Sequence, residues 1–472
     1  MHAGGAVPET VQPADVLGIQ RTAYRAEPYP ALKVRRERLR RLERAILERQ
    51  DQLAAALNSD FGGRCRQEVW FSEVLAAIRE VRHARSHVGA WMEKRPRSLD
   101  WSLQPARAWV MPQPLGVIGV IAPWNYPIFL TIGPLAGALA AGNRVMIKVS
   151  EYTPATSDAI AALVAGIFPA DLAAVVTGGP EVGRAFSSLP FDHLLFTGST
   201  AVGREVMRAA AENLTPVTLE LGGKSPAIVA PDADLDSAAA DIAYGRFLNA
   251  GQTCIAPDYA LVPAGREEEF AEAIRRQVER YWPDPARNPE YTAVINDRQA
   301  ARLRGYIEEA QAAGARVIAI GPAPEPGSRR MPPTLIVNPP DGLRVMREEI
   351  FGPILPVKTY TTMEDAIAYV NDHDRPLALY LFTKSGRTTK EVLERTISGA
   401  ACVNDTLMYI AAGNLPFGGV GASGTGHYHG RDGFDTFSKL KPVFRRRWPG
   451  LARSLRPPYG RLHDVMKRIL IG

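Results

Sequence analysis

Cysteine is scarce in this sequence: its 472 residues include only Cys65, Cys254 and Cys402. Three widely separated cysteines fit neither a disulfide framework nor a zinc-binding spacing, and they are typical of a reducing compartment. The histidine pairs His83/His87 and His427/His429 have no evident third ligand, so no metal site is expected. The first ten residues also lack the pattern of a secretory signal, and we therefore expect a cytoplasmic protein.

The sequence also lacks low-complexity tracts and long uninterrupted apolar runs. Hydrophobic residues make up 46% and charged residues 22% of the chain, which is ordinary for a globular protein and excludes disordered and fibrous classes. Residues 110–143 carry no charge and are long enough to span a membrane. Because five prolines interrupt them, this stretch predicts a buried strand, a turn and a buried helix rather than a transmembrane segment.

The net charge of +6 is unevenly distributed. Residues 439–472 contain ten basic residues and one acid, so this C-terminal arm carries +9 and leaves −3 for the rest of the chain. A near-neutral body argues against a nucleic-acid-binding protein. The arm can pack across a dimer or contact an anionic surface. The apolar residues Trp448, Leu451 and Leu455 among its charges favour packing.

The pattern of apolar residues predicts an α/β fold. Helices are expected over 33–61 and 68–91, followed by short apolar runs that alternate with helical patterns, as in a mostly parallel sheet. We expect strands at 117–121, 145–148, 173–177, 193–196, 227–229, 259–262, 315–319, 354–358, 377–382 and 400–404. A boundary near 221–223 divides the two series of strands, because a chain of this length needs more than one core.

Cys254 is the first candidate for chemistry. A single cysteine is most often a small buried hydrophobic residue. Cys254, however, follows Gly251-Gln252-Thr253, a polar, glycine-containing segment in which a thiol can be exposed. Among side chains, a thiol is the best nucleophile at neutral pH. Cys402 lies in an apolar strand-like run and is expected in the core.

Glu220 is the second candidate. It lies between two leucines at the end of a predicted strand, where apolar surroundings raise the pKa of a carboxyl group toward that of a usable general base. A salt-bridged structural glutamate is the alternative. Gly223-Lys224-Ser225 matches the end of a P-loop, but Thr218 stands where the first glycine of that motif is required.

Two turns between a strand and a helix complete the set. In Pro123-Trp124-Asn125-Tyr126-Pro127 the prolines hold Asn125, and a fixed amide suits an oxyanion site, although a helix cap is equally consistent. Residues 196–203 form a strand end, a glycine turn and a helix start, which is a geometry for binding phosphate at a helix N-terminus. Their glycine spacing differs from the usual dinucleotide-binding pattern.

Taken together, these motifs resemble the aldehyde dehydrogenase family over nearly the whole chain. The ordered set is Pro-Trp-Asn-Tyr-Pro at 123, Ile-Lys-Val-Ser-Glu at 147, Phe-Thr-Gly-Ser at 196, Leu-Glu-Leu-Gly-Gly-Lys-Ser-Pro at 219, Gly-Gln-Thr-Cys at 251, Glu-Glu-Ile-Phe-Gly-Pro at 348 and Pro-Phe-Gly-Gly at 416. The sequence around Cys254 resembles class 3 members. Residues 421–434 most resemble the coniferyl aldehyde dehydrogenase branch.

The resemblance implies a Rossmann-type cofactor-binding domain over 1–221, with part of a small bridging sheet near 100–113. It implies an α/β catalytic domain over 222–411. Residues 412–472 would return to the cofactor domain, add a bridging strand and form the basic arm. The cofactor would be NAD, with NADP as an alternative, and the oligomer a homodimer, as is typical of class 3.

The resemblance also assigns roles to single residues. Cys254 would be the nucleophile, Glu220 the general base, and Asn125 would form an oxyanion hole with the backbone N–H of Cys254. The cofactor would lie against Trp124, Lys148, Glu151, Gly198, Ser199, Gly203, Glu349 and Phe351.

These roles predict NAD(P)-dependent oxidation of an aldehyde to an acid through a Cys254 thiohemiacetal and thioester, with Glu220 activating the water. One alternative is transfer of the acyl group to coenzyme A, which a water-activating base would oppose. Another is a catalytically idle binding protein on the same fold. We expect medium-chain or aromatic substrates such as coniferaldehyde, because Tyr244, Phe247 and Phe417 lie near the motifs and can line an apolar entrance.

Overall fold

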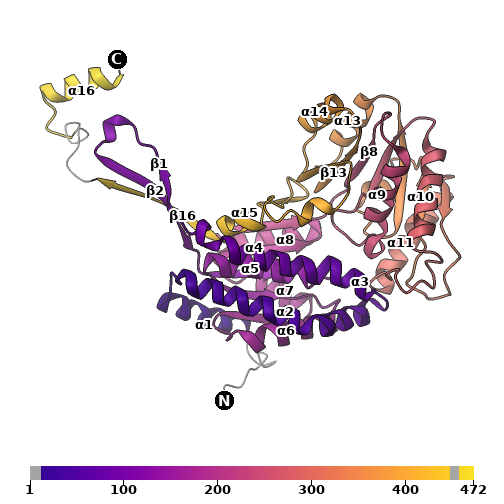
Figure 1. The fold of residues 1–472 in the computed structure, drawn as a ribbon, viewed down its shortest axis with the longest axis horizontal. Helices are drawn as coiled ribbons and strands as arrows, with labels where there is room; N and C mark the ends of the chain where they lie inside the picture. The colour runs from indigo at the N-terminus through magenta and orange to yellow at the C-terminus, as the bar shows by residue number, and fades with distance from the viewer. Residues whose placement is uncertain (1–11, 447–455, 472) are drawn as a thin grey trace.

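The chain forms three sheets, which Figure 1 shows as two packed α/β lobes and a narrow extension. The computed structural model describes residues 12–446 and 456–471. The expected α/β architecture is confirmed, and each of the ten predicted strands is found, with bounds that differ by at most two residues. The arm residues Trp448, Leu451 and Leu455 lie outside the described part of the chain.

The first lobe contains a six-stranded sheet that is parallel except for one short edge strand, β15. Its order is β15 (Gly424–Thr425), β7 (Val217–Leu221), β6 (His193–Gly198), β3 (Val117–Ile121), β4 (Arg144–Lys148) and β5 (Ala173–Val176). The chain builds outward from β3 in one direction to β5 and in the other to β7. The helix that follows β3 and the helix that follows β6 pack on opposite faces of the sheet. A crevice for ligands therefore opens at the carboxyl ends of these two strands.

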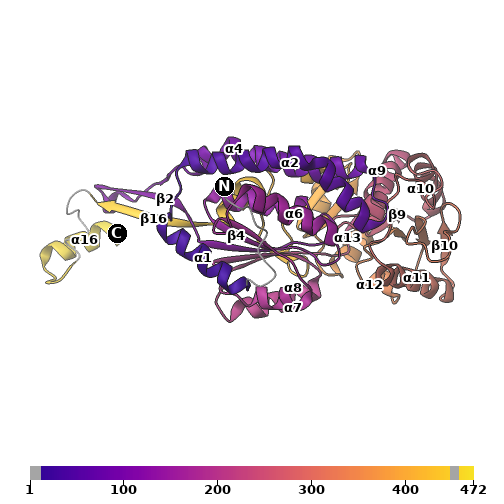
Figure 2. The same cartoon turned by 90° about the horizontal axis from the view of Figure 1, so that it is seen from below.

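Helices cover both faces of this sheet, as Figure 2 shows. One face carries α2 (Leu32–Phe61), α4 (Ala76–Trp91) and α6 (Pro154–Ile167), and the other carries α1 (Pro13–Ala26), α7 (Pro180–Ser187) and α8 (Thr200–Ala211). The helix α5 (Phe129–Ala141) packs against α2 and α4 on the first of these faces. The uncharged stretch 110–143 becomes a strand end, β3, a turn and the buried helix α5, as predicted. None of the described helices is long and apolar enough to cross a bilayer.

The second lobe is built on a seven-stranded sheet. Its order is β10 (Arg316–Ala319), β11 (Thr334–Val337), β12 (Ile354–Tyr360), β9 (Tyr259–Pro263), β8 (Pro226–Val229), β13 (Ala378–Phe382) and β14 (Ala400–Val403), with helices including α9 (Leu235–Phe247), α10 (Glu267–Tyr281) and α11 (Asp297–Ala312) packed around it. The pattern of the sequence does not predict β11. This strand is only four residues long, and prolines flank it, so it has too few residues to show a periodic pattern.

The extension joins distant parts of the chain. Its antiparallel sheet contains β1 (Arg95–Arg97), β2 (Ala106–Pro114) and β16 (Ser438–Arg446), and β16 pairs with β2 along its whole length. In Figure 1 this sheet and α16 (Arg461–Ile471) project away from both lobes. The C-terminal segment therefore contributes to two sheets: β15 lies beside β7 in the first lobe, and β16 lies beside β2 in the extension.

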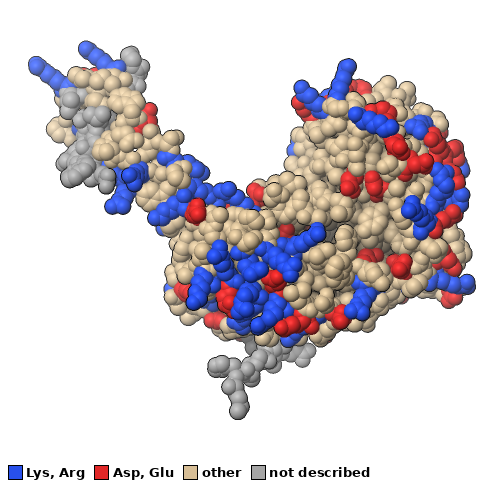
Figure 3. All heavy atoms as spheres, in the orientation of Figure 1, with Lys and Arg blue, Asp and Glu red and all other residues tan. Residues whose placement is uncertain are grey.

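Basic side chains gather over α2 and α4, with acidic side chains among them (Figure 3). On α2 the exposed pairs Arg40–Glu37 and Arg44–Glu48 have N–O distances of 2.8 and 3.5 Å. Arg35 differs because it is 1% exposed. It donates hydrogen bonds to the carbonyl oxygens of Pro30, Ala140 and Ala141, and so satisfies orphan carbonyls at the C-terminal end of α5.

Candidate active site

A polar cleft of about 530 Å³ lies where the carboxyl ends of the first sheet face the second lobe. Ten of the eleven residues selected from the sequence line it: Trp124, Asn125, Lys148, Glu151, Gly198, Ser199, Glu220, Cys254, Glu349 and Phe351. They come from segments between 124 and 351, and the sheet topology brings them together. Gly203 does not line the cleft. A Cβ at this position would lie 2.5 Å from Leu221 Cδ2, so glycine here permits close packing of α8 on β7.

The N-terminus of α8 lies at the cleft beside Gly198 and Ser199. Ser199 caps the helix by accepting a hydrogen bond from Val202 N, and the first turn carries no acidic residue. A Cβ on Gly198 would lie 2.5 Å from the ring of Phe196. The positive end of the helix dipole is thus available to a phosphate group.

Charged groups line other parts of the cleft. Lys148 is buried, and its Nζ donates to the backbone oxygen of Val149 and lies 3.4 Å from Glu151 Oε2. The carboxyl group of Glu349 lies against Gly222. A Cβ at residue 222 would lie 1.9 Å from Glu349 Oε2, so glycine makes room for this carboxyl group. Burial, followed by the nearby Asp258 carboxylate, raises the pKa of Glu349 to about 8. Its buried Oε1 has no hydrogen-bond partner among the described residues, so it remains available to a ligand.

Two aromatic side chains face each other across the cleft. The rings of Trp124 and Phe351 meet edge to face with 5.2 Å between their centroids. Phe351 has a φ of 48°, which is unusual for a bulky residue and is typical of functional sites. The cleft therefore combines a helix N-terminus, buried polar groups and aromatic surface, which is the chemistry that a dinucleotide requires.

A second cavity of about 350 Å³ opens on the other side of Cys254. Its wall is mostly apolar and comprises Phe71, Ser72, Leu75, Ala76, Arg79, Glu80, His83, Tyr126, Phe129, Leu130, Tyr244, Leu248, Thr253, Cys254, Ile255, Leu407, Met408, Ile410, Ala411, Gly413 and Phe417. Tyr244 and Phe417 line it, as expected from the sequence. Phe247 is buried in the core instead. Most of this wall could not be predicted from the sequence, because its residues are ordinary apolar side chains without a motif.

Cys254 lines both hollows. The chain reaches it through a strained turn in which Asn249, Ala250 and Gly251 have φ values of 52°, 50° and 73°. Asn249 Nδ2 stabilises this turn by donating to Gln252 O at 3.2 Å. Burial and the carboxyl groups of Glu349 and Glu220 raise the pKa of the Cys254 thiol to about 12, whereas the backbone N–H groups of residues 254 and 255 oppose that shift.

Glu220 occupies the end of β7 and is 2% exposed. Gly424 of β15 pairs with it, and a Cβ there would lie 2.1 Å from Leu219 O, so only glycine permits this close strand contact. Burial raises the pKa of Glu220 well above its ordinary value. Neither carboxyl oxygen has a hydrogen-bond partner among the described residues. Such a group is poised to take a proton rather than to form an ion pair.

Asn125 lies in the turn after β3, between a cleft residue and a cavity residue. It is 3% exposed, and its side-chain Nδ2 donates to Gln252 O at 3.2 Å, two residues before Cys254. The structure thus brings Asn125, Glu220 and Cys254 to one place, as expected. The cleft also includes Arg298 and Gln299 at the start of α11, which no motif indicated.

Known proteins resemble this chain closely. Residues 11–443 match the model of the aldehyde dehydrogenase family. A probable coniferyl aldehyde dehydrogenase of Pseudomonas aeruginosa is 52% identical over 442 residues, which cover 94% of this chain and 92% of that protein. Aldehyde dehydrogenase family 3 member A2 of Mus musculus is 39% identical over 423 residues, covering 89% of this chain and 86% of the relative.

Solved structures agree. A substrate-bound AldH of Staphylococcus aureus superposes with a TM-score of 0.91 at 35% identity, over 96% of this chain and 98% of that one. A Mycobacterium tuberculosis aldehyde dehydrogenase in complex with NAD⁺ superposes with a TM-score of 0.83 at 31% identity, over 93% and 91%. The resemblance inferred from seven short motifs is therefore confirmed, and this chain is an enzyme that belongs to the aldehyde dehydrogenase family.

Proposed function

We propose that this protein oxidises an aromatic or medium-chain aldehyde to the carboxylic acid with NAD⁺ or NADP⁺. One observation carries the proposal: Cys254 lines both the polar cleft and the apolar cavity. A thiol in this position can hold the carbonyl carbon of a substrate that enters from one side, while the hydride acceptor lies on the other.

The residues of the cleft suit a dinucleotide. The N-terminus of α8, with Gly198 and Ser199, would hold the pyrophosphate, and Lys148 with Glu151 would hold the adenine ribose. Glu349, with its unpartnered buried oxygen, would bind the second ribose, and Phe351 would support the nicotinamide. When bound, NAD⁺ would supply the hydride acceptor. The known aldehyde dehydrogenase complex with NAD⁺ has the same fold and supports this assignment.

Three side chains would then carry the chemistry. The Cys254 thiolate attacks the aldehyde carbon, and the new oxyanion accepts hydrogen bonds from Asn125 Nδ2 and the Cys254 backbone N–H. Loss of hydride leaves a thioester on Sγ. Glu220 removes a proton from water, the resulting hydroxide attacks the thioester, and the acid leaves as the Cys254 thiolate is restored. Glu220 must then release its proton before the next turnover.

The second cavity indicates the substrate. Its volume of about 350 Å³ and its apolar wall suit an aromatic ring or an alkyl chain. Arg79 and Glu80 add polar groups to that wall, which a hydroxylated ring can use. The similarity to coniferyl aldehyde dehydrogenases points to the same compounds, so coniferaldehyde is the first substrate to test.

We also propose a cytoplasmic homodimer with three parts. The cofactor domain would span 1–221 and the catalytic domain 222–411, and residues 412–472 would return to the first domain and add the strand β16 to the bridging sheet. The projecting sheet of β1, β2 and β16 supports a contact between two copies, because it offers little core of its own. The three free thiols support a reducing compartment.

A single assay separates the candidate functions. Purified enzyme is mixed with coniferaldehyde, a medium-chain aldehyde, acetaldehyde or a charged semialdehyde, each with NAD⁺ or NADP⁺ and with or without coenzyme A. We expect NADH and free acid from the first two aldehydes, with no need for coenzyme A. A requirement for coenzyme A would indicate acyl transfer, and no NADH from any aldehyde would indicate an idle binding protein. Activity confined to acetaldehyde or the semialdehyde would refute the substrate assignment.

A further inference from the structure

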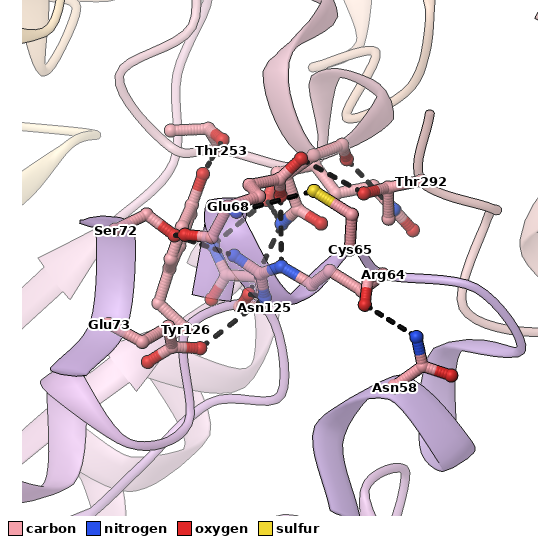
Figure 4. A network of polar contacts seen from close by, with 12 residues as sticks. Asn58, Arg64, Cys65, Glu68, Ser72, Glu73, Asn125, Tyr126, Thr253 and Thr292 are labelled. Carbon is pink, nitrogen blue, oxygen red and sulfur yellow. Dashed lines mark hydrogen bonds and ion pairs between the residues drawn. The ribbon is translucent and has the colours of Figure 1, made fainter. Parts of the chain in front are cut away.

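Behind the candidate site lies a buried polar cluster centred on Arg64 (Figure 4). The Arg64 side chain is fully buried and donates to four acceptors. These acceptors are Glu68 Oε1 at 2.9 Å, Glu73 Oε1 at 3.3 Å, Ser72 Oγ at 3.3 Å and the backbone oxygen of Asn125 at 2.8 Å. Three of the four belong to one helix, and the fourth belongs to the turn that presents the Asn125 amide.

A local change in helix geometry makes this arrangement possible. Residues 66–91 form one continuous helical segment in which Trp70–Leu75 is π-helical. Residues five apart point to different faces of an α-helix, whereas the wider π turn joins residue i to i+5 and brings them onto one face. Glu68 and Glu73 are five apart, so the π turn lets both face Arg64.

The same cluster reaches the site through two further bonds. Glu73 Oε2 accepts from Phe129 N at 2.8 Å, which ties it to the first residue of α5. Tyr126, whose ring lies 4.6 Å from the Arg64 guanidinium carbon, shares a 2.7 Å hydrogen bond with the hydroxyl of Thr253. The cluster therefore holds the backbone at Asn125 and at the start of α5, and through Tyr126 it contacts the residue directly before Cys254.

Stability alone does not require such a cluster. Arg35 is equally buried and caps the other end of α5 by donating only to backbone carbonyls. Arg64 instead has two buried carboxylates as partners, an arrangement that often costs more in desolvation than it returns. A buried cluster with this cost, in contact with the turn that presents the Asn125 amide, indicates a functional constraint.

We propose that Arg64 is a positioning residue for the reaction. By donating to the backbone oxygen of Asn125, Arg64 fixes the position of this residue, whose side-chain amide holds the oxyanion. The inference rests on the proposed role of Asn125. Arg64 touches neither substrate nor cofactor, because it lies behind the turn and lines neither hollow. Substitution of Arg64 should therefore no longer slow the reaction when the Asn125 amide is absent.

A double-mutant cycle tests this dependence. Arg64→Lys keeps the charge, but an ammonium lacks the planar fork that reaches four acceptors. We expect Arg64→Lys to slow the single-turnover NADH burst by about tenfold or more, with the Kd for NAD⁺ unchanged, because small misplacements of catalytic groups are costly. Asn125→Ala should slow it by about 10²-fold to 10³-fold. The double variant should be no more than about threefold slower than Asn125→Ala alone.

Arg35→Lys is the matched control. It should lower the Tm as Arg64→Lys does, with a burst rate within about twofold of wild type. Losses that multiply in the double variant would refute the positioning role, and so would an Arg64→Lys burst as fast as that of the control. An unaffected burst in Asn125→Ala would instead refute the proposed function. If Arg64→Lys does not fold, Glu73→Gln, which can still accept from Phe129 N, takes its place in the cycle with the same criterion.

Discussion

The two hollows that meet at Cys254 are built in different ways. The polar cleft is formed by strand ends, glycine turns and a helix N-terminus, and it contains Lys148, Glu151, Glu220 and Glu349. The apolar cavity is formed by the sides of helices, by the turn at 253–255 and by the segment 407–417. Backbone geometry determines the shape of the cleft, whereas side-chain size determines the shape of the cavity. In the proposed reaction, substitutions in the cavity wall should therefore change the substrate range and leave the chemistry in the cleft intact.

The largest effect is expected where the hollows meet. Cys254→Ala removes the nucleophile and should lower NADH formation by at least about 10³-fold, because the covalent step has no substitute. Binding of NAD⁺, measured by fluorescence quenching, should persist, since the cleft wall is otherwise unchanged. Cys402→Ser is the control and should stay within about twofold of wild type. Turnover of Cys254→Ala within about tenfold of wild type would place the nucleophile elsewhere.

On the cleft side, Glu220→Gln should separate hydride transfer from hydrolysis. Glutamine is nearly isosteric but cannot take the proton of water, so steady-state turnover should fall by about 10²-fold or more. Stopped-flow should show a burst approaching one NADH per active site, and mass spectrometry should find an acyl adduct on Cys254. If the burst slows in proportion to turnover and no adduct accumulates, Glu220 activates the thiol instead.

On the cavity side, Ala76→Trp tests whether size decides the substrate. Ala76 lines the apolar cavity and not the cleft, so an indole there should occupy part of the space for the aldehyde. We expect kcat/KM for coniferaldehyde to fall by about tenfold, with a smaller loss for acetaldehyde and an unchanged Kd for NAD⁺. Equal losses for both aldehydes would mean that substrate does not enter through this cavity.

At the far end of the cleft, Glu151→Gln should change the choice of cofactor. The Glu151 carboxylate lies beside Lys148 and would repel the 2′-phosphate of NADP⁺. Its side chain is 33% exposed, so solvent screening keeps the effect small. We expect the ratio of kcat/KM for NADP⁺ to that for NAD⁺ to rise by about fivefold. An unchanged ratio would place the adenine ribose away from Glu151.

The smallest effect concerns pH. In the proposed reaction Glu220 and Cys254 both act as anions, and burial raises the pKa of each, that of the Cys254 thiol to about 12. We therefore expect kcat/KM to rise with pH through the neutral range and to continue rising toward the pKa of the thiol. A carboxyl whose pKa is higher in the folded state stabilises the fold at low pH and loses that contribution as pH rises. Glu220→Gln should therefore gain in Tm relative to wild type with increasing pH, by about 1–3 °C. A constant difference in Tm would mean that Glu220 is not buried as the structure places it.

Much of the cleft could be predicted from the sequence, because its residues belong to turns with local rules. Prolines fix the turn around Asn125, and glycine permits the backbone path at Gly198. Ten strands could be predicted for the same reason, since a short apolar run bounded by turn residues is a local pattern. Gly203 illustrates the limit of a motif, because its position in the sequence indicated phosphate binding and its contacts indicate packing against Leu221.

Only tertiary structure decided the rest. The apolar cavity gathers side chains from Phe71 to Phe417 that carry no signal singly, and its volume depends on how helices of two lobes pack. The hydrogen bond from Arg64 to Asn125 joins residues 61 apart, and that from Asn125 to Gln252 joins residues 127 apart. Sequence determined the local conformations that chemistry needs. The distances between them follow from packing, because each contact depends on every element that lies between its two ends.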